Sequence, residues 1–182
     1  MALPVSDGHK TYVSNGDVGG IVRATDDPDG SNMQGLDGDD SLRGGKFDDA
    51  LDGGAGNDAL FGGLGADIFK IDISDIVDGA DTDKILDLNF AEGDRLALDG
   101  FAADTFSDSA GANAIGDNGH IQISSWAGLY TAMNSAVGVA ITASQVGSTD
   151  ALRLVFDDGA GTVQTLIISN AYSAYMAEGI MA

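Results

Sequence analysis

Residues 35–70 are four consecutive nonapeptides that can be written without a gap. They are Gly35-Leu-Asp-Gly-Asp-Asp-Ser-Leu-Arg43, Gly44-Gly-Lys-Phe-Asp-Asp-Ala-Leu-Asp52, Gly53-Gly-Ala-Gly-Asn-Asp-Ala-Leu-Phe61 and Gly62-Gly-Leu-Gly-Ala-Asp-Ile-Phe-Lys70. Every copy has glycine first, aspartate sixth and a large apolar residue eighth. A degenerate fifth copy at 26–34 keeps Met33 in the eighth place. Repetition at a fixed period predicts a repeat architecture.

The nine-residue period predicts short strands joined by turns. One apolar position in nine cannot form a helix face, because nine is not a multiple of 3.6. The first six residues are expected to form a turn, and the last three a strand whose eighth residue points inward while its neighbours point outward. Two repeats then complete one coil, and strands alternate between two parallel sheets. Leu42 is expected to stack on Leu60, and Leu51 on Phe69, at the strand spacing of about 4.8 Å.

The same period brings acidic turns together. Turns 18 residues apart lie on one edge, so Asp40 faces the 53–58 turn and Asp49 faces the 62–67 turn. Carboxylates this close repel one another unless a cation lies between them. Ca²⁺ takes six to eight oxygen ligands, which carboxylates and backbone carbonyls supply, whereas Mg²⁺ prefers a tighter octahedron. The repeats therefore predict calcium binding between successive coils.

Composition supports this interpretation. The chain has a formal charge of −21, and all of its 29 acidic residues except Glu92 and Glu178 are aspartates, beside 27 glycines. Aspartate and glycine favour turns. The hydrophobic content of 43% provides a core and argues against permanent disorder. The negative field argues against nucleic acid and anionic membranes as partners. The absence of cysteine excludes disulfides and zinc–thiolate sites, and no apolar stretch approaches transmembrane length.

The rest of the chain is expected to be mainly strands. We divide it into an N-terminal cap or linker (1–25), a calcium-binding β-roll (26–70) and a C-terminal β-rich cap (71–182). In the cap, 71–101 alternates apolar residues with aspartates, 102–120 is predicted to be loop, and 152–156 and 162–168 form a hairpin. A helix begins at Ser125, with Ser124 or Ser125 as N-cap. The expected fold is all-β: a parallel β-roll of nonapeptide repeats followed by a β-sandwich-like C-terminal part with one short helix.

These motifs resemble those of a known family. Residues 35–70 resemble the repeats-in-toxin (RTX), hemolysin-type calcium-binding repeats. The stretches Asp83-Lys-Ile-Leu-Asp-Leu-Asn-Phe90 and Gly93-Asp-Arg-Leu-Ala-Leu-Asp99 resemble the C-terminal region of serralysin-type proteases and alginate epimerase R-modules. The resemblance implies a β-roll that binds calcium, a C-terminus that directs export through type I secretion machinery, and an extracellular location. It also suggests that the chain is the C-terminal folding and export module of a larger protein.

Carried over by position, the resemblance implies a set of calcium ligands. The side-chain ligands would be Asp40, Asp49, Asp58 and Asp67 in sixth place, with Asp39, Asp48 and Asn57 in fifth place as further candidates. First- and third-place carbonyls would complete the shells: Gly35, Asp37, Gly44, Lys46, Gly53, Ala55, Gly62 and Leu64. Asp83 would close the last turn, about one coil beyond 62–67.

Three residues depart from the family pattern. Leu36 replaces the second glycine, Phe47 replaces the fourth, and Ala66 offers no fifth-place side chain. These substitutions put the geometry of the 44–49 turn in doubt and predict only two well-formed sites.

No catalytic constellation is encoded. The chain lacks His-Glu-x-x-His and Gly-x-Ser-x-Gly, and its only histidines are His9 and His120. We therefore expect that the chain is not an enzyme. Two alternatives stay open. One is a secreted adhesin or carbohydrate-binding protein, with an extracellular or cell-surface polysaccharide as partner and Trp126, Tyr130, Tyr172 and Tyr175 as stacking residues. The other is the C-terminal part of an extracellular enzyme, such as a metalloprotease or polysaccharide-modifying enzyme.

Overall fold

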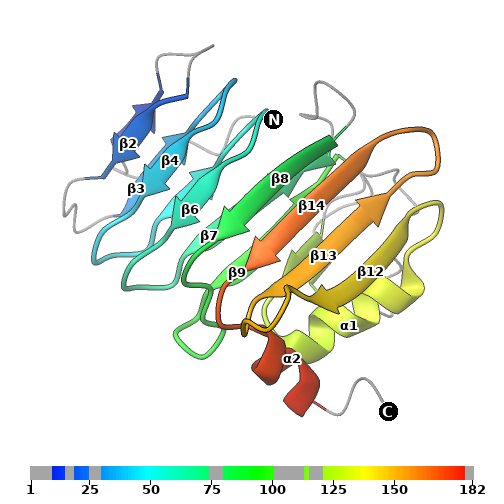
Figure 1. Ribbon diagram of the computed structural model, residues 1–182. Helices are drawn as coiled ribbons and strands as arrows, with labels where there is room; N and C mark the ends of the chain where they lie inside the picture. The colour runs from blue at the N-terminus through cyan, green and yellow to red at the C-terminus, as the bar shows by residue number, and fades with distance from the viewer. Residues whose placement is uncertain are drawn as a thin grey trace.

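The described residues form two sheets and two helices (Figure 1). The computed structural model describes residues 10–14, 19–24, 30–73, 80–100, 113–114 and 121–178. In sheet order, sheet A contains β1 (Lys10–Val13), β3 (Ser31–Gln34), β5 (Ala50–Asp52), β7 (Ile68–Asp72), β9 (Arg95–Asp99), β11 (Ile121–Ile123) and β10 (Asn113–Ala114). Sheet B contains β12 (Ala140–Gln145), β13 (Leu152–Asp157), β14 (Val163–Ile168), β8 (Ala80–Ile85), β6 (Ala59–Phe61), β4 (Ser41–Arg43) and β2 (Ile21–Arg23).

The repeats form the expected parallel β-roll. Successive strands alternate between the sheets, so that β3, β5 and β7 pair in parallel in sheet A, and β4 and β6 pair in sheet B. The predicted stacking is confirmed, because Leu42 lies opposite Leu60 and Leu51 lies opposite Phe69. All four side chains are completely buried. The eighth position of each repeat therefore supplies the core between the sheets.

The ninth residue of a repeat is buried in sheet A but not in sheet B. Asp52 and Lys70 follow inward-pointing residues of sheet A, yet both are buried. Lys70 Nζ lies 3.0 Å from Asp52 Oδ2 and 3.2 Å from Asp72 Oδ2. Burial alone would lower the lysine pKa, but the two carboxylates outweigh it and raise that pKa. The only strongly buried cation of the described repeats is thus neutralised within its own sheet.

The C-terminal part continues the two sheets of the roll. β8 pairs in parallel with β6, and β9 with β7. β14 then adds in parallel to β8, and β13 and β12 follow in antiparallel order. The predicted hairpin of 152–156 and 162–168 is confirmed as β13 and β14. Buried apolar residues from Val22 to Tyr175 form one cluster, so the sandwich-like part shares its core with the roll.

The described residues contain one helix that was expected and one that was not. α1 (Trp126–Ser135) begins as predicted, and Ser125 Oγ accepts a hydrogen bond from Gly128 N at its N-terminus. The helix ends at Ser135, and Val137 beyond it is exposed. A second helix, α2 (Tyr172–Ala177), was not predicted, because its six residues carry no side-chain cap. Neither helix of the described residues is long and apolar enough to cross a membrane.

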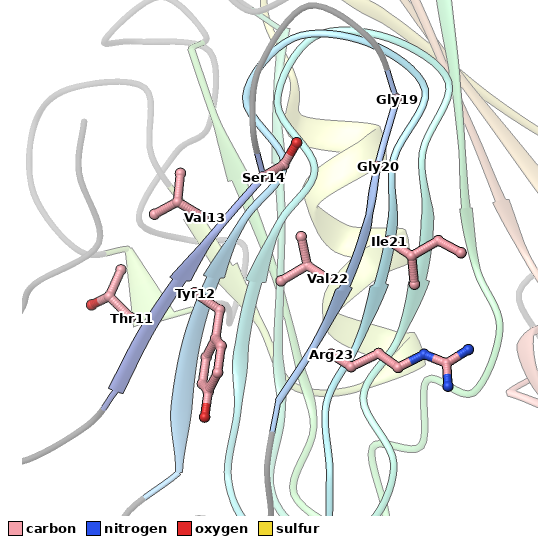
Figure 2. Close-up of a pocket in the computed structure, with 9 residues that line it drawn as sticks. All are labelled: Thr11, Tyr12, Val13, Ser14, Gly19, Gly20, Ile21, Val22 and Arg23. Carbon is pink, nitrogen blue, oxygen red and sulfur yellow. The ribbon is translucent and has the colours of Figure 1, made fainter.

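The N-terminal segment adds a first strand to each sheet. These strands are β1 and β2, within the segment that the sequence analysis described only as a cap or linker. β1 and β2 border a hollow of about 650 Å³, lined by residues 11–14 and 19–23 (Figure 2). His9, His120 and most of the predicted loop at 102–120 lie outside the described residues, although β10 places a strand within that loop.

Candidate calcium sites at the edges of the roll

The turns of the roll form two edges, one on each side of the sheets. Edge one contains the turns 35–40 and 53–58 and the residues 81–83; edge two contains 44–49, 62–67 and 87–94. Edge one holds the predicted residues Gly35, Asp37, Asp39, Asp40, Gly53, Ala55, Asn57, Asp58 and Asp83. Edge two holds Gly44, Lys46, Asp48, Asp49, Gly62, Leu64 and Asp67. The predicted set is therefore divided between two separate rows, nine residues on edge one and seven on edge two.

Sixth-place aspartates form a ladder along edge one. Asp40 N donates to Asp58 Oδ1 at 2.7 Å, and Asp58 N donates to Asp83 Oδ1 at 2.9 Å. Gly20 N donates to Asp40 Oδ1 at 2.6 Å. At the other end, the side chain of Gln164 in β14 donates to Asp83 Oδ2 at 2.8 Å. Each carboxylate thus reaches the backbone of the preceding coil, and Gln164 closes the row.

Edge two repeats the arrangement. Asp49 N donates to Asp67 Oδ1 at 2.8 Å, and Asp67 N donates to Asp94 Oδ1 at 3.0 Å. Asp94 Oδ2 accepts from Asn89 N at 2.8 Å. Asp87 accepts from Gly62 N and Gly63 N at 2.9 and 2.8 Å. The carboxylate row therefore extends beyond the last nonapeptide on this edge as well.

Asp83 is part of an aspartate ladder, but the edge predicted for it was wrong. It was expected to close the 62–67 turn, but Lys84 lies opposite Ala59, which puts Asp83 beside Asp58 on edge one. Asp94 closes the 62–67 turn instead. The spacing along the chain is 25 residues from Asp58 to Asp83 and 27 from Asp67 to Asp94, instead of 18 within the repeats.

The sequence analysis did not predict that Asp94, Asp81 and Asp87 lie on the edges of the roll. A signal for Asp94 was present. Each ladder aspartate precedes a buried apolar residue by two positions, as Asp58 precedes Leu60, and Asp94 precedes Leu96 in the same way. Asp81 and Asp87 show no such spacing, and only the fold brings them to the edges.

Burial makes the ladder carboxylates unfavourable as free anions. Asp58 and Asp67 are each 1% exposed. Desolvation, reinforced by neighbouring carboxylates, raises the pKa of Asp58, Asp67 and Asp83 to about 7. The same burial raises the pKa of Asp49 and Asp94. A divalent cation between the coils would offset this cost and restore the ionised form.

Unpartnered oxygens show that the turns fit a cation. Asp40 Oδ2 and Asp58 Oδ2 are buried and have no hydrogen-bond donor. No three carboxylates of the described residues converge on one point, so backbone carbonyls have to complete any coordination shell. Such a mixed oxygen set suits Ca²⁺. Buried acceptors without donors are costly, which favours a bound cation at these positions.

The first place of these repeats requires glycine, because oxygen atoms of neighbouring groups lie where a Cβ would be. A Cβ on Gly53 would overlap Asp58 Oδ2, and a Cβ on Gly62 would overlap Asp67 Oδ2. At Gly35, a Cβ would overlap the carbonyl oxygen of Gly53 in the next coil. These turns therefore have no room for any side chain beside the carboxylate.

Fifth-place side chains connect coils near the solvent. Asp39 Oδ1 accepts from Asn57 N and Nδ2 at 2.9 and 3.1 Å. Asp48 Oδ1 accepts from Ala66 N at 2.9 Å. The hydrogen bonds from Asn57 hold the pKa of Asp39 below its usual value. The third-place carbonyl of Ala55 already accepts from Gly38 N at 2.8 Å. The fifth-place acids are thus exposed, and the sixth-place acids form the buried row.

The 44–49 turn departs from the others, as its sequence predicted. Gly38, Gly54, Gly56, Gly63 and Gly65 have positive φ, and Leu36 has φ +73°. Gly45 and Phe47 occupy the equivalent second and fourth places without positive φ. A β-carbon disfavours the left-handed region, so Phe47 forces a different path on its turn.

Replacing Leu36 by glycine is expected to stabilise the calcium-bound chain by about 0.5–1 kcal/mol. The left-handed backbone costs a side chain roughly 1–2 kcal/mol, and the added entropy of glycine offsets part of the gain. Urea unfolding in saturating calcium measures the change. Leu64→Gly is the matched control, because Leu64 has no positive φ and should lose stability. Equal losses in both variants would contradict the prediction.

The metal-free chain is expected to lose stability as pH rises from 5 to 8. Asp58, Asp67 and Asp83 have pKa values of about 7 when folded, against an ordinary aspartate pKa of 3.8. The folded state therefore binds more protons across this interval, and stability falls as they dissociate. Circular dichroism after calcium removal on a chelating resin tests this, because it measures the β-structure content at each pH. Metal-free stability that rises between pH 5 and 8 would contradict it.

The aromatic residues proposed for stacking do not form one surface. Tyr175 is buried, and Trp126 packs edge-on against both Phe90 and Tyr175 with ring centroids 4.8 and 6.5 Å apart. Tyr130 is exposed. These contacts give Trp126 and Tyr175 a packing role between α1, α2 and the 87–94 turn.

Comparison with known proteins identifies the repeat segment. Residues 34–69 match the family model of the RTX calcium-binding nonapeptide repeat in four copies. No curated protein matches the chain, and nothing identifies the C-terminal region. The matched copies coincide with the turns that carry the two carboxylate ladders. The segment 34–69 is therefore a set of four RTX calcium-binding nonapeptide repeats.

Proposed function

We propose that this chain is a module that folds on binding calcium after type I secretion, as the C-terminal part of a larger extracellular protein. The observation that supports this most directly is the buried ladder of Asp40, Asp58 and Asp83, with unpartnered oxygens on the first two. RTX repeats are typical of secreted proteins, which agrees with the proposal.

Calcium couples to folding through the roll. β4, β5 and β6 have three residues each and cannot be stable alone. Without calcium, buried carboxylates on both edges oppose the stacking of coils. With calcium, the free energy of binding becomes free energy of folding. The chain would stay expanded in the calcium-poor cytosol and would fold where calcium is abundant.

The remaining features of the proposal concern export. The type I secretion machinery would be the cytosolic partner, and the signal would lie within 71–182. In this proposal the chain itself is not an enzyme, and its cargo is the rest of the larger protein.

A calcium titration followed by circular dichroism tests the folding step. We expect β structure to appear with calcium, a melting temperature that rises with calcium concentration, and reversal by a chelator. At a calcium concentration 100 times the Kd, mass action contributes about 2.7 kcal/mol. Magnesium at equal ionic strength is the control and should have little effect. Identical spectra and melting curves in calcium and in chelator would refute the proposal.

An export assay tests the secretion step separately. A reporter fused ahead of the chain should reach the medium only from cells with a type I exporter. Removing 71–182 should retain the reporter inside the cell. Export without that segment would contradict its assignment as the signal-bearing part.

A further inference from the structure

The strands at the ends of the two sheets differ in how well they are protected against pairing with another chain. In the described part of the chain, sheet A ends in β1 and β10, and sheet B ends in β2 and β12 (Figure 1). An edge strand exposes unpaired backbone groups, and proteins protect such edges with short strands, charged residues, proline or bulges. β10 has two residues, β2 has three and carries Arg23, and β1 carries Lys10. Each of these three edges therefore has at least one protection.

The strand β12 has none of these protections. It is six residues long, Ala140-Ile-Thr-Ala-Ser-Gln145, without charge or proline. Its register with β13 runs one to one, from Ala140 opposite Asp157 to Gln145 opposite Leu152, so it contains no bulge. Residues 118–149 contain no Asp, Glu, Lys or Arg, although the whole chain is 20% charged. Among the described strands, β13 alone pairs with β12, which leaves its other side as an open, uncharged edge.

Hydrogen bonds next to β12 show which of its backbone groups face the open edge. Val146 N, directly after the strand, donates to Ala151 O at 3.0 Å, so Val146 faces β13. Residues of an antiparallel strand face one neighbouring strand and the other in alternation. Asp158 N donates to Thr162 O at 3.3 Å beside β14, which gives β13 the same alternation. The N–H and C=O groups that point to the open edge of β12 therefore belong to three residues: Ile141, Ala143 and Gln145.

We propose that the open edge of β12 pairs with β12 of a second copy of this chain, antiparallel and about a two-fold axis through Ala143. This register places Ala143 opposite Ala143 of the second copy and Ile141 opposite its Gln145. All three edge-facing residues then pair, and each pair exchanges two hydrogen bonds, about six in total. The contact is self-complementary, as two-fold symmetry requires, and it joins the two copies of sheet B into one continuous sheet.

The side chains of β12 fit this continuation of the sheet. Ile141 and Ala143 pack against the core, whereas Thr142 and Ser144 are exposed on the outer face. The proposed register places Thr142 opposite Ser144 of the second copy, and threonine and serine form favourable cross-strand pairs. The inner and outer faces of the two copies are therefore continuous across the new strand pair.

The distribution of charge favours a second copy at this edge. Two chains of net charge −21 repel each other, and the carboxylate rows of the roll make contact between those surfaces costly. β12 carries no charged side chain, so the new strand pair opposes no like charges. A basic partner would instead be attracted to the carboxylate rows.

The inference goes beyond calcium-dependent folding, and the two can fail separately. Circular dichroism measures folding, whereas sedimentation measures association. If calcium does not fold the chain, the proposed function fails. If calcium folds the chain and the folded chain stays monomeric, this inference alone fails.

Sedimentation of the full chain in saturating calcium tests the association. We expect a reversible equilibrium between monomer and dimer as the protein concentration rises. The dimer should become tighter with added salt, because salt screens the repulsion between two acidic chains. A dimer that weakens with salt would overturn the inference, because it would indicate contact between basic and acidic surfaces.

Variants of β12 test its edge. Ala143→Pro should weaken the dimer at least ~10-fold, because it removes the central N–H donor of both copies. That N–H faces the open edge, where proline is tolerated. Thr142→Lys should weaken the dimer by about two- to five-fold, because it places like charges on adjacent strands. Ala160→Lys is the matched control, since it adds the same charge in the exposed turn between β13 and β14, and its effect should be less than about two-fold.

Single cysteines test the register, because the chain has no cysteine of its own. Ala143→Cys should form a disulfide-linked dimer when diamide oxidises the two thiols, since the axis brings the two Cα atoms to about 5.5 Å. Ala140→Cys is the matched control on the same strand. Its two copies would lie about 20 Å apart and should not be linked.

Several results would overturn the inference. They are a monomer at every concentration, equal cross-linking of the two cysteine variants, and a folded Ala143→Pro that dimerises as well as the unmodified chain. If Ala143→Pro does not fold, Thr142→Lys and the cysteine pair decide the outcome. A dimer that is insensitive to Thr142→Lys and links no Ala143→Cys would place the contact on another surface.

Discussion

Replacing Asp58 by asparagine is expected to weaken the response to calcium at least ~10-fold in midpoint, equivalent to about 1.4 kcal/mol. Asp58 is the central carboxylate of edge one, between Asp40 and Asp83. Asparagine keeps the shape and the Oδ1 acceptor for Asp40 N but removes the charge that Ca²⁺ requires.

The metal-free form should respond in the opposite direction. Burial raises the pKa of Asp58 to about 7, so its ionisation above that pH opposes folding. Asp58→Asn removes this cost, and the metal-free chain at pH 8 should be at least as stable as the unmodified chain. A calcium titration measures the first effect, and circular dichroism in chelator at pH 8 measures the second.

Glu178→Gln is the matched control for Asp58→Asn. It removes one exposed negative charge at the end of α2, which borders residues 87–91 of edge two and none of the turns of edge one. Its calcium midpoint should be unchanged. A midpoint for Asp58→Asn equal to that of the control would show that edge one does not bind calcium through this carboxylate.

Leu60→Ala is expected to destabilise the calcium-bound chain by about 2–5 kcal/mol, the range for a buried leucine truncated to alanine. Leu60 is completely buried and lies between Leu42 and Ile85 in sheet B. The strands on both sides hold their own backbone hydrogen bonds and cannot collapse into the cavity. Urea unfolding in saturating calcium measures the loss.

Leu64→Ala makes the same chemical change at an exposed position. Leu64 is 59% exposed in the 62–67 turn, and only its backbone carbonyl was predicted to contact calcium. Its stability should change by no more than about 0.5 kcal/mol. Similar losses in the two variants would contradict the assignment of the eighth position as the core of the roll.

The nonapeptide period by itself determined the architecture of 35–70. Each residue repeats the role of the residue 18 positions earlier, so the facing of Leu42 to Leu60 and of Asp40 to Asp58 follows from counting. The substitution at Phe47 also predicted an irregular turn, because the conformational limits of a side chain are local. Local rules were sufficient wherever the period was unbroken.

Beyond residue 70 the period is interrupted, and only tertiary pairing decides the register. Asp83 lies on edge one beside Asp58, and Asp94 closes edge two. β14 then pairs with β8 and brings Gln164 to Asp83, 81 residues away in sequence. No local pattern encodes such a pairing, because it depends on which strand edge remains available after the roll has formed.

The distribution of charge on the outer face of sheet B depends on the same long-range register. Arg23 and Arg153 are 130 positions apart in number, and they share a face only because β2 and β13 belong to one continuous sheet. The sequence alone determined the repeating coil and the carboxylates along its edges, because both follow from a fixed local period. The tertiary structure decided how the last coil closes and where the scattered positive charges gather, because strand pairing across long connections sets both.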